Sequence, residues 1–270
     1  MRYPLRLAVT AIGLALGASV PLGAQTVTPR VRLSALEVQA RVAAAGTGVA
    51  DLRSTDLAGL DLHGMTLVSA DLRGASLDGA NLRGANLFSA DLTDATLRGA
   101  DLTDANLDGS TLRRADASKA IMLRASLFAV IAEQGNFSGA DLRKTRIIGY
   151  FRAANLSDAD LREANIGADP GNQSMGVMRT IFESATLVRA RFGGANLYKA
   201  DFNFADAGDA VFTGANLSTT VLRGTNFTGA DFTGAELTFA DFNGAILTQA
   251  RGLTDAKGIE SAKNRDKATP

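Results

Sequence analysis

The amino-acid sequence predicts an all-β solenoid in which short extended segments alternate with sharp turns. An apolar residue, usually Leu in the first half and often Phe in the second, returns at every fifth position from Leu52 onward. Ala usually stands two positions before it, as Ala70 does before Leu72. Polar residues or Gly follow it, as Arg73 and Gly74 do. A repeat this regular is typical of coils stacked along one axis.

The period of five excludes long regular elements. Five residues of α-helix turn through about 500°, so the apolar side chains would point in every direction. In a straight strand, alternate apolar residues would lie on opposite faces, because the side-chain period is two. All of them can point inward only if the chain turns a corner after each short segment. Gly and small polar residues then occupy the corners, where they tolerate the turn conformation.

The repeated motif resembles that of the pentapeptide-repeat proteins, whose pattern is A(D/N)LXX. Residues 80–84, Ala-Asn-Leu-Arg-Gly, are one clear copy, and copies cover most of residues 50–249. The resemblance implies a right-handed quadrilateral parallel β-helix with four pentapeptides per coil, so that residues twenty positions apart stack about 4.8 Å apart. The inward core expected from this stacking comprises Leu52, Leu72, Leu92, Leu112, Leu67, Leu87, Leu107, Leu127, Phe192, Phe212 and Phe232.

The N-terminus has the features of a secretory signal peptide. Arg2 and Arg6 precede an uncharged run at residues 7–20, and cleavage is expected after Ala24. The run is short for a membrane span, and no later segment is apolar enough to form one. We therefore expect no membrane span in the mature chain.

The repeat is interrupted once. After Ile147 the next apolar position arrives one residue early, at Phe151, and residues 169–174 are rich in turn-forming residues. The interruption is either a tolerated surface insertion or a recognition loop.

The predicted organisation follows from these boundaries. The end coils of a repeat array need covering, which favours a short amphipathic capping helix at residues 33–45. The last residues are polar and basic, and they are expected to form a short helix or a disordered tail. The expected parts are a signal peptide (1–24), an N-terminal segment with the capping helix (25–49), the first part of the solenoid (50–166), an interrupting loop (167–181), the second part of the solenoid (182–249) and a C-terminal tail (250–270).

Composition and motifs exclude most catalytic chemistry. The 270 residues contain no Cys, so disulfides, thiolate metal sites and Cys nucleophiles are excluded. The 28 basic and 28 acidic residues balance, so no strong attraction to nucleic acid is expected. His63 is the one His and occupies an outward position, and no nucleophile-elbow, zinc-protease, phosphate-loop or dinucleotide motif is present. We expect no enzyme activity, no cofactor and no metal site.

One outward column is apolar and forms the candidate interaction surface. Its members are Val68, Phe88, Phe128 and Ile148, with Asp108 among them. Exposed apolar groups in a row indicate a contact surface. The alternatives are scattered surface hydrophobes, or a site where the N-terminal segment or the tail packs.

Two further columns are charged. One is partly basic (Arg53, Arg73 and Arg113), and another is acidic (Asp51, Asp71 and Asp91). Stacked carboxylates are hard-oxygen ligands of the kind that cations prefer. However, Asp recurs at this position throughout the array, where it can accept backbone N–H groups, and Arg lies alongside. A structural role is therefore favoured.

The expected function is that of an exported, non-catalytic pentapeptide-repeat protein that acts as a structural or protein-interaction scaffold in the periplasm or outside the cell. The expected partner is an unknown protein or a second copy, not nucleic acid. A secreted effector is one alternative. Another comes from the resemblance, because some family members mimic DNA and inhibit a type II topoisomerase. Mimicry needs dense negative charge, whereas residues 50–149 carry 13 acidic and 11 basic side chains.

Overall fold

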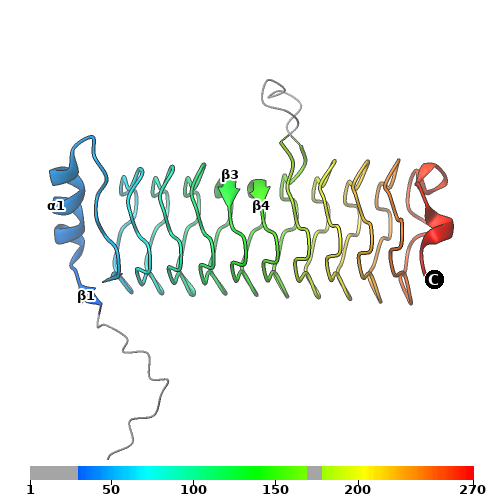
Figure 1. Cartoon of the computed structure of the whole chain (residues 1–270), viewed down its shortest axis with the longest axis horizontal. Coiled ribbons are helices and arrows are strands. Elements are labelled where there is room, and N and C mark those ends of the chain that lie inside the picture. The colour runs from blue at the N-terminus through cyan, green and yellow to red at the C-terminus, as the bar shows by residue number, and fades with distance from the viewer. Residues whose placement is uncertain (1–29, 169–177) are drawn as a thin grey trace, which may run out of the picture.

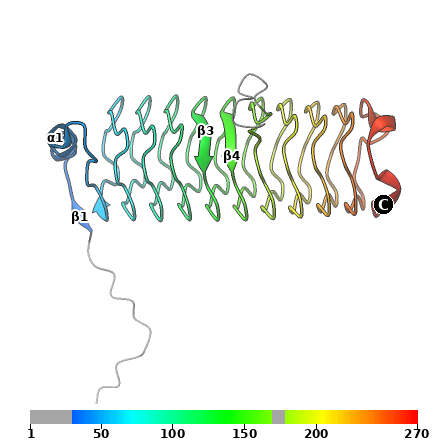
Figure 2. The same ribbon diagram turned by 45° about the horizontal axis from the view of Figure 1, so that its top comes forward.

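The computed structural model describes residues 30–168 and 178–270. These residues form an elongated stack of coils, with helix α1 at one end and the C-terminus at the other (Figure 1). A second view shows that each coil lies directly on the previous one (Figure 2). The expected signal peptide lies outside the described residues, as do residues 169–177 of the expected loop.

Parallel backbone bridges join each coil to the next. In the regular part of the stack, bridged residues are twenty positions apart, and each pentapeptide makes one bridge. The bridges form four ladders, which we number by their first members: ladder 1 starts at Asp51, ladder 2 at Asp56, ladder 3 at Asp61 and ladder 4 at Thr66. Each turn is named by the two ladders that it joins, so the 4–1 turn leads from ladder 4 to ladder 1.

Every pentapeptide is built in the same way. Asp71 makes the bridge and Leu72 points inward. The carbonyl of Leu72 accepts a hydrogen bond from the Ala75 N–H at 3.0 Å, which closes a turn. The second turn residue, Gly74, has a φ of +65°, a left-handed conformation that Gly adopts without steric cost. This turn redirects the chain after each extended segment, which is how the fifth residue always returns to the inside.

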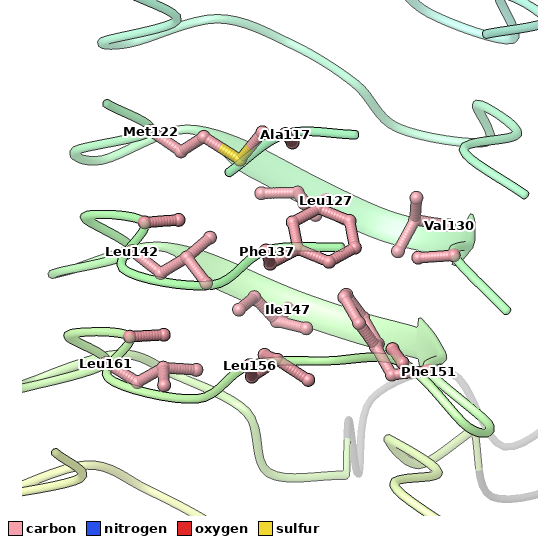
Figure 3. Packing of buried hydrophobic residues seen from close by; sticks show 14 of the residues in the cluster. Ala117, Met122, Leu127, Val130, Phe137, Leu142, Ile147, Phe151, Leu156 and Leu161 are labelled. Atoms are coloured by element: carbon pink, nitrogen blue, oxygen red, sulfur yellow. The ribbon is translucent and has the colours of Figure 1, made fainter. Parts of the chain in front are cut away.

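The recurring apolar residues form one continuous core along the stack. All of the inward Leu and Phe residues expected from the sequence are fully buried. Figure 3 shows Leu127 and Ile147 stacked in successive coils. In the second half, the ring centroid of Phe212 lies 5.0 Å from that of Phe192 and 5.2 Å from that of Phe232. Burial of each such side chain contributes about 1.5–3 kcal/mol.

One coil is a residue shorter than its neighbours. Strand β3 (Ser126–Ile131) pairs in parallel with β4 (Arg146–Tyr150), and the register shifts between Phe128 and Val130. Beyond these strands, three bridged pairs are nineteen positions apart, and Asn136 with Asn155 is the first of them. This register shift explains why the apolar residue Phe151 comes one position early in the sequence.

Gly149 makes this shorter coil possible. A Cβ atom at this position would lie 2.2 Å from the carbonyl oxygen of Val130, so only Gly allows the two backbones to approach. The chain then continues in its new phase, and Phe151 is fully buried.

The chain between ladder 4 and ladder 1 is longer than usual at one turn. Asn165 and Ile181 both make bridges to the next coil, although they are 16 positions apart (181 minus 165) and not five. The buried hydroxyl of Thr180 lies 3.0 Å from the carbonyl oxygens of Ile147 and Ile166, to which it donates. Thr180 therefore holds the end of this long segment against the stack.

The N-terminal end of the core is covered by a helix. The elements here are β1 (Val31–Arg32), which pairs with β2 (Thr55–Asp56), and α1 (Ala35–Ala45). Ser34 and Glu37 form a capping box at the start of α1, and Val38 is buried against the first coil. Within the described ranges, no helix is long and apolar enough to cross a bilayer.

Residues 250–270, expected as a tail, form a further coil. Its bridge residues are six positions apart instead of five: Arg251, Lys257, Lys263 and Thr269. The longer connections contain the short helices η2 (Ile259–Ser261) and η3 (Arg265–Lys267). The sequence carries a signal for this change, because Ala precedes each bridge residue at the same spacing of six: Ala250, Ala256, Ala262 and Ala268.

Candidate interaction surface

The 4–1 turn carries the apolar column expected from the sequence. Val68 is 40% exposed and Phe88 is 46% exposed. Phe128 is half-buried, and the guanidinium carbon of Arg146 lies 4.2 Å from its ring centroid, within range of a cation–π interaction. Three of the four expected residues therefore form an accessible apolar row.

Ile148, the fourth expected member, is only 2% exposed, so its assignment to the surface was wrong. Ile148 belongs to β4, in the coil that is one residue shorter than its neighbours. Because this coil is shorter, its chain takes a different path through the turn. The long segment that ends at Thr180 also returns beside the neighbouring Ile147 carbonyl. Constant five-residue spacing could not predict this burial, because the spacing fails at this turn.

Asp108 lies within the row, but its carboxylate forms hydrogen bonds with neighbouring groups of the protein. Its carboxylate accepts hydrogen bonds from the Phe128 N–H at 2.8 Å and from the Ser126 hydroxyl at 2.5 Å. The carboxylate thus fixes the backbone of the row and leaves the apolar side chains as its outward feature.

Tyr198 extends the row beyond the long segment and was missed in the sequence. It occupies the same first turn position after Leu197, and the ammonium group of Lys199 lies 5.1 Å from its ring centroid. The sequence could have predicted Tyr198. When the five-residue spacing is counted again from Ile181, Tyr198 falls at the same turn position as the other members of the row. We call Val68, Phe88, Phe128 and Tyr198 the 4–1 ridge.

The other turns are different in character. At the first turn position of the first three coils, they carry mainly charged or small polar residues: Arg53, Arg73 and Thr93 on the 1–2 turn, Ala58, Asp78 and Arg98 on the 2–3 turn, and His63, Arg83 and Thr103 on the 3–4 turn. Because interface cores are depleted in charge and enriched in aromatic residues, the 4–1 turn is the best candidate contact surface among the four turns of these coils.

The basic column on the 1–2 turn is neutralised by its neighbours. Arg53 lies 2.7 Å from Asp51, and Arg73 lies 2.5 Å from Asp71. The hydrogen bond from the Arg73 side chain holds the pKa of the Asp71 carboxyl below its usual value. The third member, Arg113, pairs with Glu133 at 3.1 Å. The column is therefore a row of ion pairs and carries no net positive charge.

The acidic column also has structural partners. The carboxylates of Asp51, Asp71 and Asp91 each accept a hydrogen bond from the backbone N–H two residues later, at 3.0–3.3 Å. Within residues 30–168 and 178–270, no cluster of His, Asp and Glu side chains is arranged to hold a metal ion. These contacts account for Asp at the bridge position as a support for the turn.

His63 is exposed and lines a cleft between α1 and the first coil. The cleft has a volume of about 470 Å³ and is also lined by Gln39, Val42 and Met65. Its lining contains no carboxylate that could orient His63, and its one hydroxyl belongs to Thr66. The cleft lies where the capping helix meets the stack. We interpret it as a gap left by the packing of the helix on the first coil.

The family model for pentapeptide repeats matches this chain in eight copies, at residues 50–84, 67–104, 85–122, 182–214 and 210–249. The chain is a pentapeptide-repeat protein. The matched ranges fall on either side of the shorter coil and the long 4–1 segment, where the five-residue spacing is broken.

Solved structures of other pentapeptide-repeat proteins are similar to this one. HetL, a pentapeptide-repeat protein involved in regulation of heterocyst differentiation in the cyanobacterium Nostoc sp. strain PCC 7120, is 25% identical, with a TM-score of 0.59 over 88% of this chain and 94% of HetL. QnrB1, a plasmid-mediated fluoroquinolone resistance protein, is 18% identical, with a TM-score of 0.34 over 78% and 92%. A protein of the Arabidopsis thaliana thylakoid lumen is 29% identical, with a TM-score of 0.25 over 46% and 73%. No curated protein sequence matches the chain.

Proposed function

We propose that this pentapeptide-repeat protein is a non-catalytic scaffold that binds a partner protein, or a second copy of itself, through the 4–1 ridge. The observation that supports this is the row of Val68, Phe88 and Phe128 on one turn, while the other turns of the first three coils carry mainly charged or small polar residues at the same position. Apolar side chains that remain exposed in a row, on a fold whose core is already filled, mark a contact surface.

The proposal includes a finer description of the fold. The four ladders and the stacking period of twenty residues support a quadrilateral β-helix, and the right-handed sense is what the family resemblance implies. A rod of this kind presents its turns as straight lines of side chains, one per coil. Recognition along such a line depends on the order of side chains on successive coils and needs no pocket.

The proposal also places the protein in the periplasm or outside the cell. The support is the basic and apolar character of residues 1–24. N-terminal sequencing of the exported protein should read from Gln25. Recovery of the chain from the cytosol with Met1 or Arg2 at its N-terminus would contradict export.

DNA mimicry is not favoured by the charge arrangement. A mimic must present a dense negative surface, since duplex DNA carries about one charge per 1.7 Å of axis. Here Arg98 and Arg124 lie 2.5 and 2.6 Å from Asp78 and Asp104, and pairs of this kind recur along the first half. The acidic side chains are therefore largely compensated by basic ones.

A pair of double variants tests the role of the 4–1 ridge. Phe88→Ser with Phe128→Ser should leave the fold intact, because both residues lie outside the core, but should weaken self-association or partner binding at least tenfold. Leu123→Ser with Val188→Ser is the matched control, since both are half-buried residues at the same turn position on other turns. Sedimentation velocity and crosslinked capture from the exported fraction would measure the effect. Equal behaviour of the two double variants would refute the proposal.

A further inference from the structure

Two aromatic side chains of the 4–1 ridge are separated by two coils. Parallel bridges join Asn86 to Asn106 and Asn106 to Ser126. Phe88 and Phe128, two residues after the first and the last of these, therefore occupy equivalent places in coils that are two apart. Since successive coils are spaced by about 4.8 Å, the two places are separated by about 9.6 Å along the stack. A ligand that lies along this turn meets an aromatic ring at both ends of that distance.

The coil between the two rings carries no bulky apolar side chain at this turn. Asp108 is half-buried, and its carboxylate accepts hydrogen bonds from the Phe128 N–H and from the Ser126 hydroxyl. The next residue, Gly109, has no side chain. The two rings are therefore separate apolar anchors, and a ligand can pass over the coil between them.

Two amide groups beside the rings have unused hydrogen-bond donors. The side-chain oxygens of Asn86 and Asn106 accept hydrogen bonds from the backbone N–H two residues later, at 3.1 and 2.9 Å. Within residues 30–168 and 178–270, the Nδ2 atom of neither residue has a hydrogen-bond partner. Elsewhere such amides donate to the preceding coil, as Nδ2 of Asn81 does to Asp61 at 2.8 Å. Both residues are partly exposed, so their amide donors are available to a ligand.

We propose that the 4–1 ridge binds a proline-rich segment of a partner protein in the polyproline II conformation, an inference that rests on the proposed scaffold function. This conformation has three residues per turn and a rise of about 3.1 Å per residue, so prolines three positions apart lie on one side at a spacing of about 9.3 Å. That spacing matches the separation of about 9.6 Å between coils that are two apart. Two such prolines would pack on Phe88 and Phe128.

The hydrogen-bonding chemistry agrees with the spacing. A polyproline II segment makes no internal hydrogen bonds, so its carbonyl groups are free to accept them. Proline has no backbone N–H, so a proline-rich segment needs donors from its binding site and few acceptors. The amides of Asn86 and Asn106 supply donors directly beside the rings. The segment is also extended before it binds, which keeps the entropic cost of ordering it low.

Other ligands fit the ridge less well. Alternate residues on one face of an extended strand are about 6.6–6.8 Å apart. Seven residues of α-helix span about 10.5 Å, and the carbonyl groups of a helix are already bonded within it. A second copy of this chain cannot supply the ligand, because no two of its five Pro residues are three positions apart: Pro4, Pro21, Pro29, Pro170 and Pro270.

Fluorescence anisotropy with a labelled decapeptide of L-proline tests the inference. The decapeptide of D-proline is the matched probe, because it has the same composition and the opposite helical hand. We expect the wild type to bind the L-peptide at least tenfold more tightly than the D-peptide. Phe88→Ser with Phe128→Ser should weaken binding of the L-peptide at least tenfold, since both anchors are lost.

Two further variants separate the donors from general exposure of aromatic rings. Asn86→Asp with Asn106→Asp removes the amide donors but keeps the oxygens that support the turns, so it should weaken binding of the L-peptide at least threefold. Phe204→Gly is the control, because its ring is 67% exposed on the 1–2 turn and Ala153 and Gly244 occupy the equivalent places two coils away. It should leave binding unchanged.

The outcomes distinguish this inference from the proposed scaffold function. The inference is overturned if the wild type does not bind the L-peptide, if it binds both peptides equally, or if Phe88→Ser with Phe128→Ser binds the L-peptide as the wild type does. The scaffold function fails separately, if that double variant keeps its self-association and its capture of partners. A partner captured through Phe88 and Phe128 by a protein that does not bind the L-peptide would preserve the scaffold function and exclude the proline-rich ligand.

Discussion

The two halves of the stack share a backbone but differ in the side chains that hold it together. Between residues 50 and 166 the inward positions are mainly Leu, and the turns carry ion pairs such as Arg98 with Asp78. Between residues 182 and 249, Phe rings stack in the core. There the turns are fixed mainly by hydroxyl hydrogen bonds, such as that from Thr233 to Asp231. The same four ladders run through both halves. The backbone bridges therefore set the geometry, and the core and the surface vary independently around it.

The Phe columns show how a larger side chain fits the same coil. The centroids of Phe192, Phe212 and Phe232 are spaced by 5.0–5.2 Å, close to the spacing of about 4.8 Å between paired strands. The rings of Phe192 and Phe212 are nearly parallel, with an interplanar angle of 3°. Rings from other columns, such as Phe227, meet Phe212 edge-on at 76°. The second half thus gains aromatic contacts that the Leu columns do not provide.

A charge in the core should break the first half completely. Leu107 is fully buried, and Leu107→Asp would place a carboxylate there without a partner, which costs several kcal/mol. We expect loss of the cooperative thermal transition measured by circular dichroism. Asn106→Asp is the matched control, because Asp is common at this outward bridge position and should leave the transition intact. A cooperative melt for Leu107→Asp would mean that residue 107 does not face the core.

Truncation of one Phe should cost more than truncation of one Leu. Phe212→Ala should lower the free energy of unfolding by about 3–5 kcal/mol, because it leaves a cavity and removes ring contacts. Leu112→Ala, which leaves a smaller cavity in a Leu column, should cost less, toward the lower end of the range of about 2–5 kcal/mol for such changes. Urea denaturation of the two variants measures the difference. Equal losses would contradict the expectation that the larger, stacked Phe ring contributes more to stability than a Leu side chain.

Acid should weaken the ion-paired turns, with the smallest effect of the three. Hydrogen bonds from Arg73 and Arg143 lower the pKa of the Asp71 and Asp141 carboxyls in the folded protein. A lowered folded pKa stabilises the protein above the unfolded value of about 3.9, and this contribution is lost as the pH falls through the folded pKa.

The urea midpoint should therefore change little between pH 7 and 5 and should decline below about pH 4. Arg73→Gln with Arg143→Gln should make that decline slightly shallower, because ion pairs with exposed guanidinium groups contribute little to stability. A double variant that loses as much stability in acid as the wild type would show that these pairs do not stabilise the fold.

The sequence predicts the core well because one rule, the return of an apolar residue at each fifth position, applies to almost every coil. It also located the break, since Phe151 arrives early and is buried in its new phase. The rule fails where the number of residues between bridges changes. Ile148 is buried for this reason, and residues 250–270 form a coil with a spacing of six.

The surface was harder to predict than the core. The repeat assigns a residue to a turn, but exposure depends on which side chain of the next coil lies over it. Phe128 is partly covered by Arg146, whereas Phe204 remains exposed beside Gly224. A signal for Phe204 was nevertheless present, because Phe stands where Gly is usual, as at Gly224 and Gly244.

The long 4–1 segment has a consequence for how such proteins diversify and how they could be engineered. Asn165 and Ile181 keep their places in the ladders although eleven extra residues separate them (16 minus 5). A turn can thus accept a long additional stretch of chain while the ladders on both sides of it continue. Peptides grafted at chosen turns would be held at distances set by the number of coils between them. The protein could therefore display several epitopes along one line at defined spacings.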